Sequence, residues 1–295
     1  MNMKKVDLHM HSNISNDGEY TPDRLMEMCK DAGLEMVALA DHNSLSGIPE
    51  AKKKAEVLGL YFIPAVELDC ALDGINFHLL GYHISDKRNW FRENEKRIFA
   101  SELAAGSKMM DGVENTGILV DREKVAAVSK DGAITGEMIA EVVLSDERNK
   151  DNELLMPYRS GGSRADNPLV NFYWDFCSQG KPAYAKVEYP TFEEAIREII
   201  KDGGIPVLAH PGANIGCRRD IIEKMKALGL RGIEVYSSYH NKETIAFYNQ
   251  LADELELMKT IGSDFHGKTK PSIRLGNVDM PERDKDKTIE YMVSI

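Results

Sequence analysis

Short apolar runs alternate along this chain with stretches in which apolar residues recur every three or four positions. Runs of this kind predict buried strands, and the recurrence predicts amphipathic helices, so the alternation indicates β/α units. We expect strands at 5–12, 36–43, 61–69, 76–83, 205–211, 232–238 and 259–266. We expect helices at 21–33, 48–59, 191–204, 220–229 and 242–256, most of them ended by glycine. Strands separated by helices in this number predict an α/β barrel rather than an open sheet.

The alternation breaks once, between the strands expected at 76–83 and 205–211. The intervening residues contain helix-prone tracts and a loop-like PYRSGGSRADNP, with little strand-like sequence. We therefore predict a barrel domain formed by 1–86 and 187–295, with a helical insertion or cap domain at 87–186.

Composition narrows the classes of function. The formal net charge of −11 argues against a general nucleic-acid surface, so no extended nucleic acid is expected as a partner. The scattered cysteines suggest neither a zinc knuckle nor a disulfide framework. Neither a signal peptide nor a spanning helix is indicated, so we expect a cytoplasmic protein without a membrane partner.

Two histidines end the first expected strand, in VDLHMHS. Side chains alternate faces along a strand, so His9 and His11 should point the same way. Buried polar rings cost free energy unless something pairs with them, and the obvious partner is a metal ion. By itself, a His-x-His pair is only moderately specific evidence for a metal site.

The other histidines strengthen this interpretation, because most of them also lie in or at the end of an expected strand. They are His42, His78, His83, His210 and His266, and the carboxylates near such positions are Asp7, Asp17, Asp41, Glu67 and Asp264. In barrels of parallel strands, catalytic groups gather at the C-terminal strand ends. Taken together, these positions predict a metal site, although any one of them could be an ordinary hydrogen-bonded residue.

The ordered motifs VDLHMHS, ALADHNSLSG, PAVELD, FHLLGYH, VLAHPG and GSDFHG resemble those of the polymerase and histidinol phosphatase (PHP) family, especially its stand-alone phosphoesterases. The resemblance implies a distorted seven-stranded barrel with three divalent metal ions. It implies that His9, His11, Glu67 and Asp264 hold the first ion, that Glu67, His78 and His210 hold the second, and that Asp17, His42 and His266 hold the third. Some members have histidine where this chain has Asp17.

The same resemblance suggests further roles. We assign catalytic roles to His210, Asp264 and His266. We expect Asp7, Asp41 and His83 to support the ligands from behind, although Asp7 and Asp41 could equally be caps or surface carboxylates.

The expected activity is hydrolysis of a small phosphomonoester, of the nucleoside monophosphate or 3′,5′-bisphosphate type, by attack of a metal-bound hydroxide. A mixed imidazole and carboxylate set suits manganese, iron or zinc. Arginine matches phosphate oxygens with a planar fork, and the candidates are Arg159, Arg164, Arg218 and Arg219. The aromatic run NFYWDF, at 171–176, could stack a base, although packing of Phe172, Trp174 and Phe176 into the insertion's own core is favoured.

Two other functions stay open. Metal-dependent amidohydrolases, which cleave C–N bonds, also open with His-x-His, but those with paired metals often use a barrel lysine where this chain has Glu67. The other possibility is a non-catalytic binding module stabilised by metal, against which the full ligand set argues.

Overall fold

A computed structural model describes residues 3, 5–85 and 87–295 of the chain. Each expected strand is present in it. The strands are β1 (Val6–Met10), β2 (Met36–Leu39), β3 (Tyr61–Leu72), β4 (Ile75–Tyr82), β5 (Ile205–Leu208), β6 (Gly232–Ser237) and β7 (Met258–Gly262).

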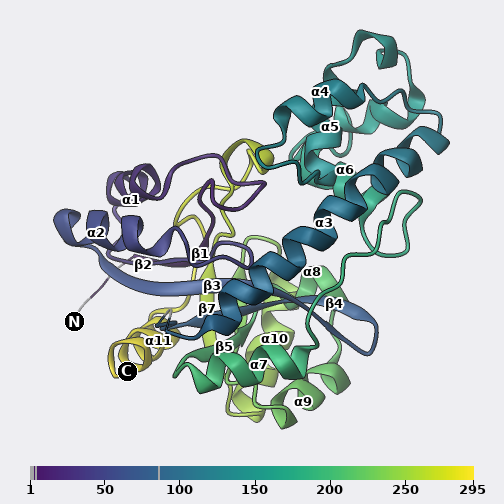
Figure 1. Ribbon diagram of the computed structural model, residues 1–295. Helices are drawn as coiled ribbons and strands as arrows, with labels where there is room; N and C mark the ends of the chain where they lie inside the picture. The colour runs from purple at the N-terminus through teal and green to yellow at the C-terminus, as the bar shows by residue number, and fades with distance from the viewer. Residues whose placement is uncertain (1–2, 4, 86) are drawn as a thin grey trace.

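The strands form one seven-stranded sheet in chain order, and the sheet curls until its two edges meet (Figure 1). Met10, the last residue of β1, bridges to Phe265 beyond β7. The amide of His11 donates to the carbonyl of Phe265 at 2.9 Å, and the amide of Asp264 donates to the carbonyl of His9 at 2.8 Å. The predicted seven-stranded α/β barrel is therefore confirmed, in a nearly closed form.

One strand departs from the parallel barrel that the sequence predicts. β4 runs antiparallel to both β3 and β5. The cause is the short turn between β3 and β4, where Asp73 and Gly74 both have positive φ, 52° and 80°. Two such residues form the tight connection of a β-hairpin, which can join only antiparallel strands.

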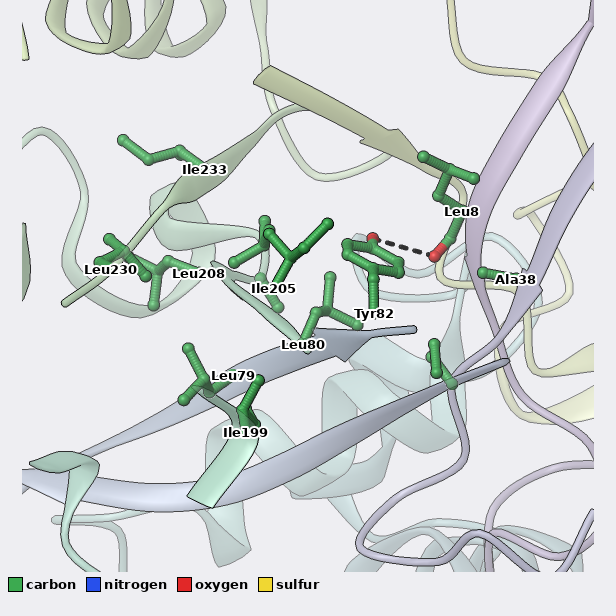
Figure 2. Close-up of a cluster of buried hydrophobic side chains, with 14 of the residues drawn as sticks. Leu8, Ala38, Leu79, Leu80, Tyr82, Ile199, Ile205, Leu208, Leu230 and Ile233 are labelled. Carbon is green, nitrogen blue, oxygen red and sulfur yellow. Dashed lines mark hydrogen bonds between the residues drawn. The ribbon is translucent and has the colours of Figure 1, made fainter. Parts of the chain in front are cut away.

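Apolar side chains fill part of the barrel interior. Tyr82 of β4 is fully buried there, and its hydroxyl donates to the carbonyl of Leu8 in β1 at 3.0 Å (Figure 2). Leu80 and Ile205 lie beside it in the same cluster (Figure 2). This bond satisfies a buried hydroxyl that would otherwise be costly, and it ties two strands across the interior.

Helices cover the outside of the barrel (Figure 1). They are α1 (Pro22–Asp31), α2 (Ile48–Leu58), α7 (Phe192–Lys201), α8 (Pro211–Ile215), α9 (Arg219–Ala227), α10 (Lys242–Glu254) and α11 (Glu282–Val293). Their apolar faces pack on the strands: α7, for example, buries Phe192 and Ile196 in the main core. These match the helices expected from the periodicity, and α8 and α11 are additional.

The segment between β4 and β5 is mostly helical, as predicted, and we call 87–186 the insertion. It contains α3 (Asn89–Asn115), α4 (Arg122–Val128), α5 (Gly136–Ser145) and α6 (Pro168–Phe172), with a turn of π-helix, η3 (Tyr173–Cys177), and two short 3₁₀ turns. The long α3 leads from the barrel to the other helices (Figure 1).

The apolar side chains of α4, α5 and α6, with those of the far half of α3, form a hydrophobic cluster of their own. The division into two domains stays a prediction, and its boundary residue 86 lies outside the described residues. No described helix combines the length and apolar composition that crossing a membrane requires.

Candidate metal centre

Histidine side chains from several strands meet at one end of the barrel. His9 lies in β1 and His11 follows that strand, and their Nε2 atoms are 3.1 Å apart. The rings therefore converge as side-chain alternation along a strand predicts. The ring centroids of His42 and His266 lie 4.4 and 4.0 Å from that of His11. Such crowding of imidazoles is unfavourable unless a shared partner binds them.

Glu67 of β3 is fully buried at the middle of these rings. Its Oε1 lies 3.0 Å from Nδ1 of His78 and 3.1 Å from Nε2 of His210. Its Oε2 lies 3.1 Å from the Nε2 atoms of both His9 and His11. Nδ1 of His42 also lies 3.3 Å from Oε2, so the two carboxylate oxygens face different sets of imidazoles, which is the arrangement needed for one carboxylate to bridge two metal ions.

Candidate ligand atoms within 4.8 Å of one another form four groups. They are His9, His11, Glu67 and Asp264; Glu67, His78 and His210; His11, His42 and His266; and His42, Asp69 and His78. The first two groups contain the residues that the family resemblance implies for the first and second ions. The individual ligand roles stay predictions.

Asp17 is the predicted ligand that belongs to none of these groups among the described residues. Its Oδ2 nevertheless lies 3.1 Å from Nε2 of His266 and 3.9 Å from Nε2 of His42. The third predicted set is therefore brought together, with Asp17 at its edge. Asp69, which sequence reasoning missed, has an oxygen 3.1 Å from Nε2 of His78, because the two residues are cross-strand partners in the β3–β4 hairpin.

Unpartnered buried atoms test whether these residues fit metal ions. Five such atoms of this cluster lack a hydrogen-bond partner within the described part of the chain, namely Asp17 Oδ1, His42 Nδ1, Glu67 Oε2, Asp264 Oδ1 and His266 Nε2. Leaving a buried polar atom unsatisfied costs about 1–3 kcal/mol, so five together need an explanation. Metal coordination would satisfy all of them. The cluster therefore fits several buried metal sites.

The electrostatics of Glu67 and His11 agree with this fit, whereas at His9 and His78 the charge of Glu67, with the other carboxylates nearby, outweighs burial and raises the pKa of the imidazole well above its usual range. Burial alone would raise the pKa of Glu67, but the neighbouring imidazoles, His9 and His78 foremost, hold it well below its usual range. Burial, reinforced by the charges of His266 and His42, lowers the pKa of His11 to about 4. An ionised carboxylate and a neutral imidazole are the protonation states in which these groups bind metals.

Asp264 is held by donors on one side only. Its Oδ2 accepts hydrogen bonds from the hydroxyl of Tyr239 at 2.7 Å and from Nζ of Lys270 at 2.6 Å. Its Oδ1 is left facing Nε2 of His11 at 3.1 Å. Asp264 and His210 also have positive φ, 57° and 24°, a conformation that costs about 1–3 kcal/mol and is often found at functional sites. The two donors orient Asp264 so that one oxygen stays free for a ligand.

Sequence reasoning also missed Glu234, which supports two of the candidate ligands. This residue of β6 is fully buried, and its Oε1 lies 2.9 Å from Nδ1 of His9 while its Oε2 accepts from the amide of His210 at 2.9 Å. Gly262 of β7 makes room for it, since an added Cβ there would meet Oε1 of Glu234 at 2.2 Å. The sequence does contain a signal for this residue, because Glu234 is a charged residue within GIEVYSS, an otherwise uncharged run that predicts a buried strand.

We expect Glu234→Gln to weaken metal binding by about 10–100-fold, the usual cost of losing a group that orients a ligand histidine. The substitution keeps the shape of the side chain but removes the charge that fixes the His9 ring. Titration of the metal-free protein with Mn²⁺ against a competing chelator would measure the effect. Glu243→Gln, on the exposed first turn of α10, is the matched control. An unchanged affinity in Glu234→Gln would rule out the supporting role.

The three residues predicted to support the ligands have different surroundings. Asp7 accepts from the backbone amides of Ser263, Gly276 and His9 at 2.9, 2.8 and 3.3 Å, so it holds backbone rather than imidazole rings. His83 follows β4 and contacts the backbone of Met292 in α11. About five strand residues, or roughly 16 Å, separate it from His78. Neither residue touches a candidate ligand ring in the structure.

Asp41 does reach the ligands, through a serine. It accepts from the hydroxyl of Ser15 at 2.9 Å, and that same oxygen lies 3.2 Å from Nδ1 of His11. The Ser15 hydroxyl also accepts from the amide of His42 at 2.9 Å. This chain of contacts fixes the orientation of His11 from behind, which is consistent with the predicted supporting role of Asp41.

A cavity of about 550 Å³ lies between this end of the barrel and the insertion. Asp17, His42 and His78 line it on the barrel side, together with Asp69 and Lys270. A space of this size suits a small organic ligand, because small-molecule sites occupy roughly 300–1,000 Å³. A substrate in this cavity would therefore lie between the candidate metal centre and the insertion.

The arginines predicted to bind phosphate do not line this cavity. All of them pair with protein groups instead. The partners are the carbonyls of Leu144 and Asn149 for Arg159, Asp175 for Arg164, Asp220 for Arg218, and Glu223 and Glu254 for Arg219. Their role in substrate binding stays a prediction, and the structure offers Lys270 as a cation closer to the candidate ligands.

Comparison with known proteins agrees with the site. The PHP domain matches residues 7–203 of the chain. A 5′-3′ exoribonuclease from Haemophilus influenzae is 28% identical over 269 residues, covering 89% of this chain and 90% of the relative. A 3′,5′-nucleoside bisphosphate phosphatase from Chromobacterium violaceum is 27% identical over 288 residues, covering 95% and 93%. Both relatives are named for hydrolysis of phosphoester bonds.

A solved structure of an amidohydrolase from Chromobacterium violaceum, with bound sulfate and no metal, has the same fold. Its TM-score is 0.80 at 23% identity, and the alignment covers 98% of this chain and 97% of that one. At this identity the likeness shows the fold and says nothing about the reaction. The PHP match over about two thirds of the sequence, with the two relatives, shows that the chain belongs to the PHP family and is a hydrolase of phosphoester bonds.

Proposed function

We propose that this protein is a metal-dependent phosphatase that hydrolyses a small phosphomonoester, of the nucleoside monophosphate or 3′,5′-bisphosphate type. The observation that carries the proposal is the position of Glu67, whose two oxygens face different sets of imidazoles beside the cavity. The relative from Chromobacterium violaceum, which is named for a nucleoside bisphosphate, supports the substrate class.

Three divalent ions, of manganese, iron or zinc, fit the mixed nitrogen and oxygen ligands. The proposed sets are His9, His11, Glu67 and Asp264; Glu67, His78 and His210; and Asp17, His42 and His266. When bound, such ions supply Lewis acidity, which lowers the pKa of water and neutralises charge on phosphoryl oxygens. We retain His210, Asp264 and His266 as the residues on which catalysis depends most.

The chain's own residues prepare this site for a phosphate. Tyr239 and Lys270 fix Asp264 through Oδ2, so that the carboxylate does not turn away from its neighbours. Lys270 also lines the cavity, where its ammonium group can contact a phosphoryl oxygen. The insertion covers the cavity and restricts the water around the reacting group, which strengthens electrostatic interactions there.

A panel of substrates tests the proposal on protein stripped with a chelator and reloaded with Mn²⁺. The panel contains nucleoside 5′-monophosphates, a nucleoside 3′,5′-bisphosphate, ribose 5-phosphate, a 5′-phosphorylated triribonucleotide and a set of amides. We expect release of inorganic phosphate from the nucleotide monoesters, with kcat/KM at least about ten-fold above the triribonucleotide, because the acidic chain lacks a track of cations for a longer strand.

Other outcomes of the panel would replace the proposal. Shortening of the triribonucleotide without phosphate release would make the protein a phosphodiesterase, as the name of the Haemophilus influenzae relative suggests. Turnover of amides alone would favour C–N hydrolysis. Tight metal binding without turnover of any substrate would leave a metal-stabilised binding module.

A further inference from the structure

The side of the cavity that faces the candidate metal centre is built mainly by the insertion, with Tyr189 from the segment before α7, and is rich in aromatic rings. We call it the aromatic wall, and it consists of Tyr173, Trp174, Tyr184 and Tyr189, with the carboxyl groups of Glu102 and Glu137 beside them. In the run NFYWDF, Phe172 and Phe176 stack in the insertion's core, with ring centroids 4.5 Å apart. Packing into the core therefore accounts for those two phenylalanines but not for Trp174.

The rings of Tyr173 and Trp174 form a corner. Their centroids are 5.4 Å apart and their planes are inclined at 68°. Both lie in the π-helical turn Tyr173–Cys177, where the wider turn changes the direction of successive side chains. Turns of this kind occur frequently at functional sites. A planar group entering the cavity could stack on one ring while its edge meets the other.

The polar atoms of the aromatic wall also lack partners. The hydroxyls of Tyr173, Tyr184 and Tyr189 make no hydrogen bond within the described part of the chain, and Glu102 has neither a hydrogen bond nor a salt bridge there. Burial, helped by the charges of Asp69 and Asp17, raises the pKa of Glu102 to about 8. Groups left unpaired beside a cavity are available to a ligand that has hydrogen-bonding edges.

The charged groups on the two sides of the cavity indicate how a bound ligand is oriented. The insertion lines the cavity with one lysine, Lys96, and with the carboxyl groups of Glu95 and Asp131 besides those of Glu102 and Glu137, whose pKa burial raises. A phosphate is disfavoured beside those carboxyl groups, whereas the barrel side has Lys270 and the candidate metal ligands. The anionic end of a substrate therefore belongs on the barrel side, and its uncharged end belongs against the insertion.

We propose that the aromatic wall is a nucleobase subsite, in which the base stacks on Trp174, lies with one edge against Tyr173 and hydrogen-bonds Glu102. The inference rests on the proposed phosphatase function and specifies the part of the substrate that the metal centre does not touch. The aromatic wall matches a nucleoside better than a sugar phosphate, because a base can stack on its rings and hydrogen-bond its unpaired polar groups. We expect the subsite to accept any of the bases, because every base has a face that can stack.

The ratio of kcat/KM for adenosine 5′-monophosphate to kcat/KM for ribose 5-phosphate tests the subsite. Both substrates place a phosphate at the metal centre, so changes in metal loading cancel from the ratio. We expect Trp174→Leu to lower it by about five-fold or more, the lower end of the contribution of one base stack. Trp174→Phe, which keeps an aromatic ring, should retain most of the ratio. An unchanged ratio in Trp174→Leu would overturn the proposal.

Fluorescence provides a second readout that does not require turnover. The chain has two tryptophans, and Trp90→Phe leaves Trp174 as the single emitter. Trp90 is a suitable position to change because it lies in α3, donates to Glu194 at 3.0 Å and does not line the cavity. We expect saturable quenching when adenosine, which carries no phosphate, is added to the metal-loaded Trp90→Phe protein.

The two readouts separate failure of the subsite from failure of the phosphatase proposal. Quenching by adenosine without phosphate release from any substrate would keep the nucleobase subsite and reject the phosphatase function. Phosphate release with equal kcat/KM for the nucleotide and the sugar phosphate, and without quenching, would keep the function and reject the subsite.

Discussion

Glu67→Gln should reduce kcat by roughly 1,000-fold or more and release most of the bound metal. Loss of one group that stabilises charge in a transition state already costs about 10²–10³ in kcat, and loss of a group that only orients a ligand costs 10–100-fold in metal affinity. Glu67 stands between two candidate sets of ligands, so its removal affects both. The amide is nearly isosteric, but it lacks the charge that draws His9 and His78 together.

Metal content by elemental analysis and kcat on the preferred nucleotide measure these effects. Glu198→Gln is the matched control, because Glu198 is also a buried glutamate but pairs with Arg88 and Lys201 on the outside of the barrel. The control should keep its metal and its kcat. Full metal content in a correctly folded Glu67→Gln protein would contradict the bridging position of this residue.

Addition of Mn²⁺ to the metal-free protein should raise its Tm by about 5 °C or more. A ligand at 100 times its Kd stabilises the folded state by about 2.7 kcal/mol per site, and each kcal/mol shifts Tm by about 2–4 °C in domains somewhat smaller than this one. The free energy comes from satisfying the unpartnered atoms of Asp17, His42, Glu67, Asp264 and His266. Several sites filled together would increase the shift.

Differential scanning fluorimetry after chelation can measure this shift for Mn²⁺, Fe²⁺ and Zn²⁺. Ca²⁺ is the control ion, since it prefers oxygen ligands and should bind the histidine-rich cluster poorly. Glu67→Gln should lose most of the Mn²⁺ shift. If none of the three transition-metal ions changes Tm at millimolar concentration, the cluster is not a metal centre.

The fold was predictable because its signals are local. Each strand has its own apolar run, and each barrel helix has its own periodicity, so the elements could be identified one at a time. The direction of β4 was not predicted, because the β-hairpin at Asp73 and Gly74 differs from a longer connection by only a few residues. The antiparallel pairing makes His78 the cross-strand partner of Asp69, a contact that the sequence analysis did not predict.

The site was predictable to the extent that motifs carry it. The histidines could be grouped through the resemblance of their motifs to the PHP family, whereas Glu234 supports His9 from a strand 225 positions away, a contact visible only after folding. For the arginines, a suitable residue type was not enough to predict a place in the site. Their chemistry suits phosphate, but nearby acidic residues such as Asp175 and Asp220 already pair with Arg164 and Arg218.

The insertion is joined to the barrel by one chain crossing after β4 and another before α7 (Figure 1). The candidate metal ligands all come from the barrel, and the aromatic wall comes from the insertion except for Tyr189, which precedes α7. Substitutions in the aromatic wall, at Trp174 for example, can therefore accumulate without disturbing the ligands of the reaction. The substrate of such an enzyme can therefore change during evolution while the metal ligands stay the same. We expect the sequences of paralogues to diverge faster in the insertion than in the barrel.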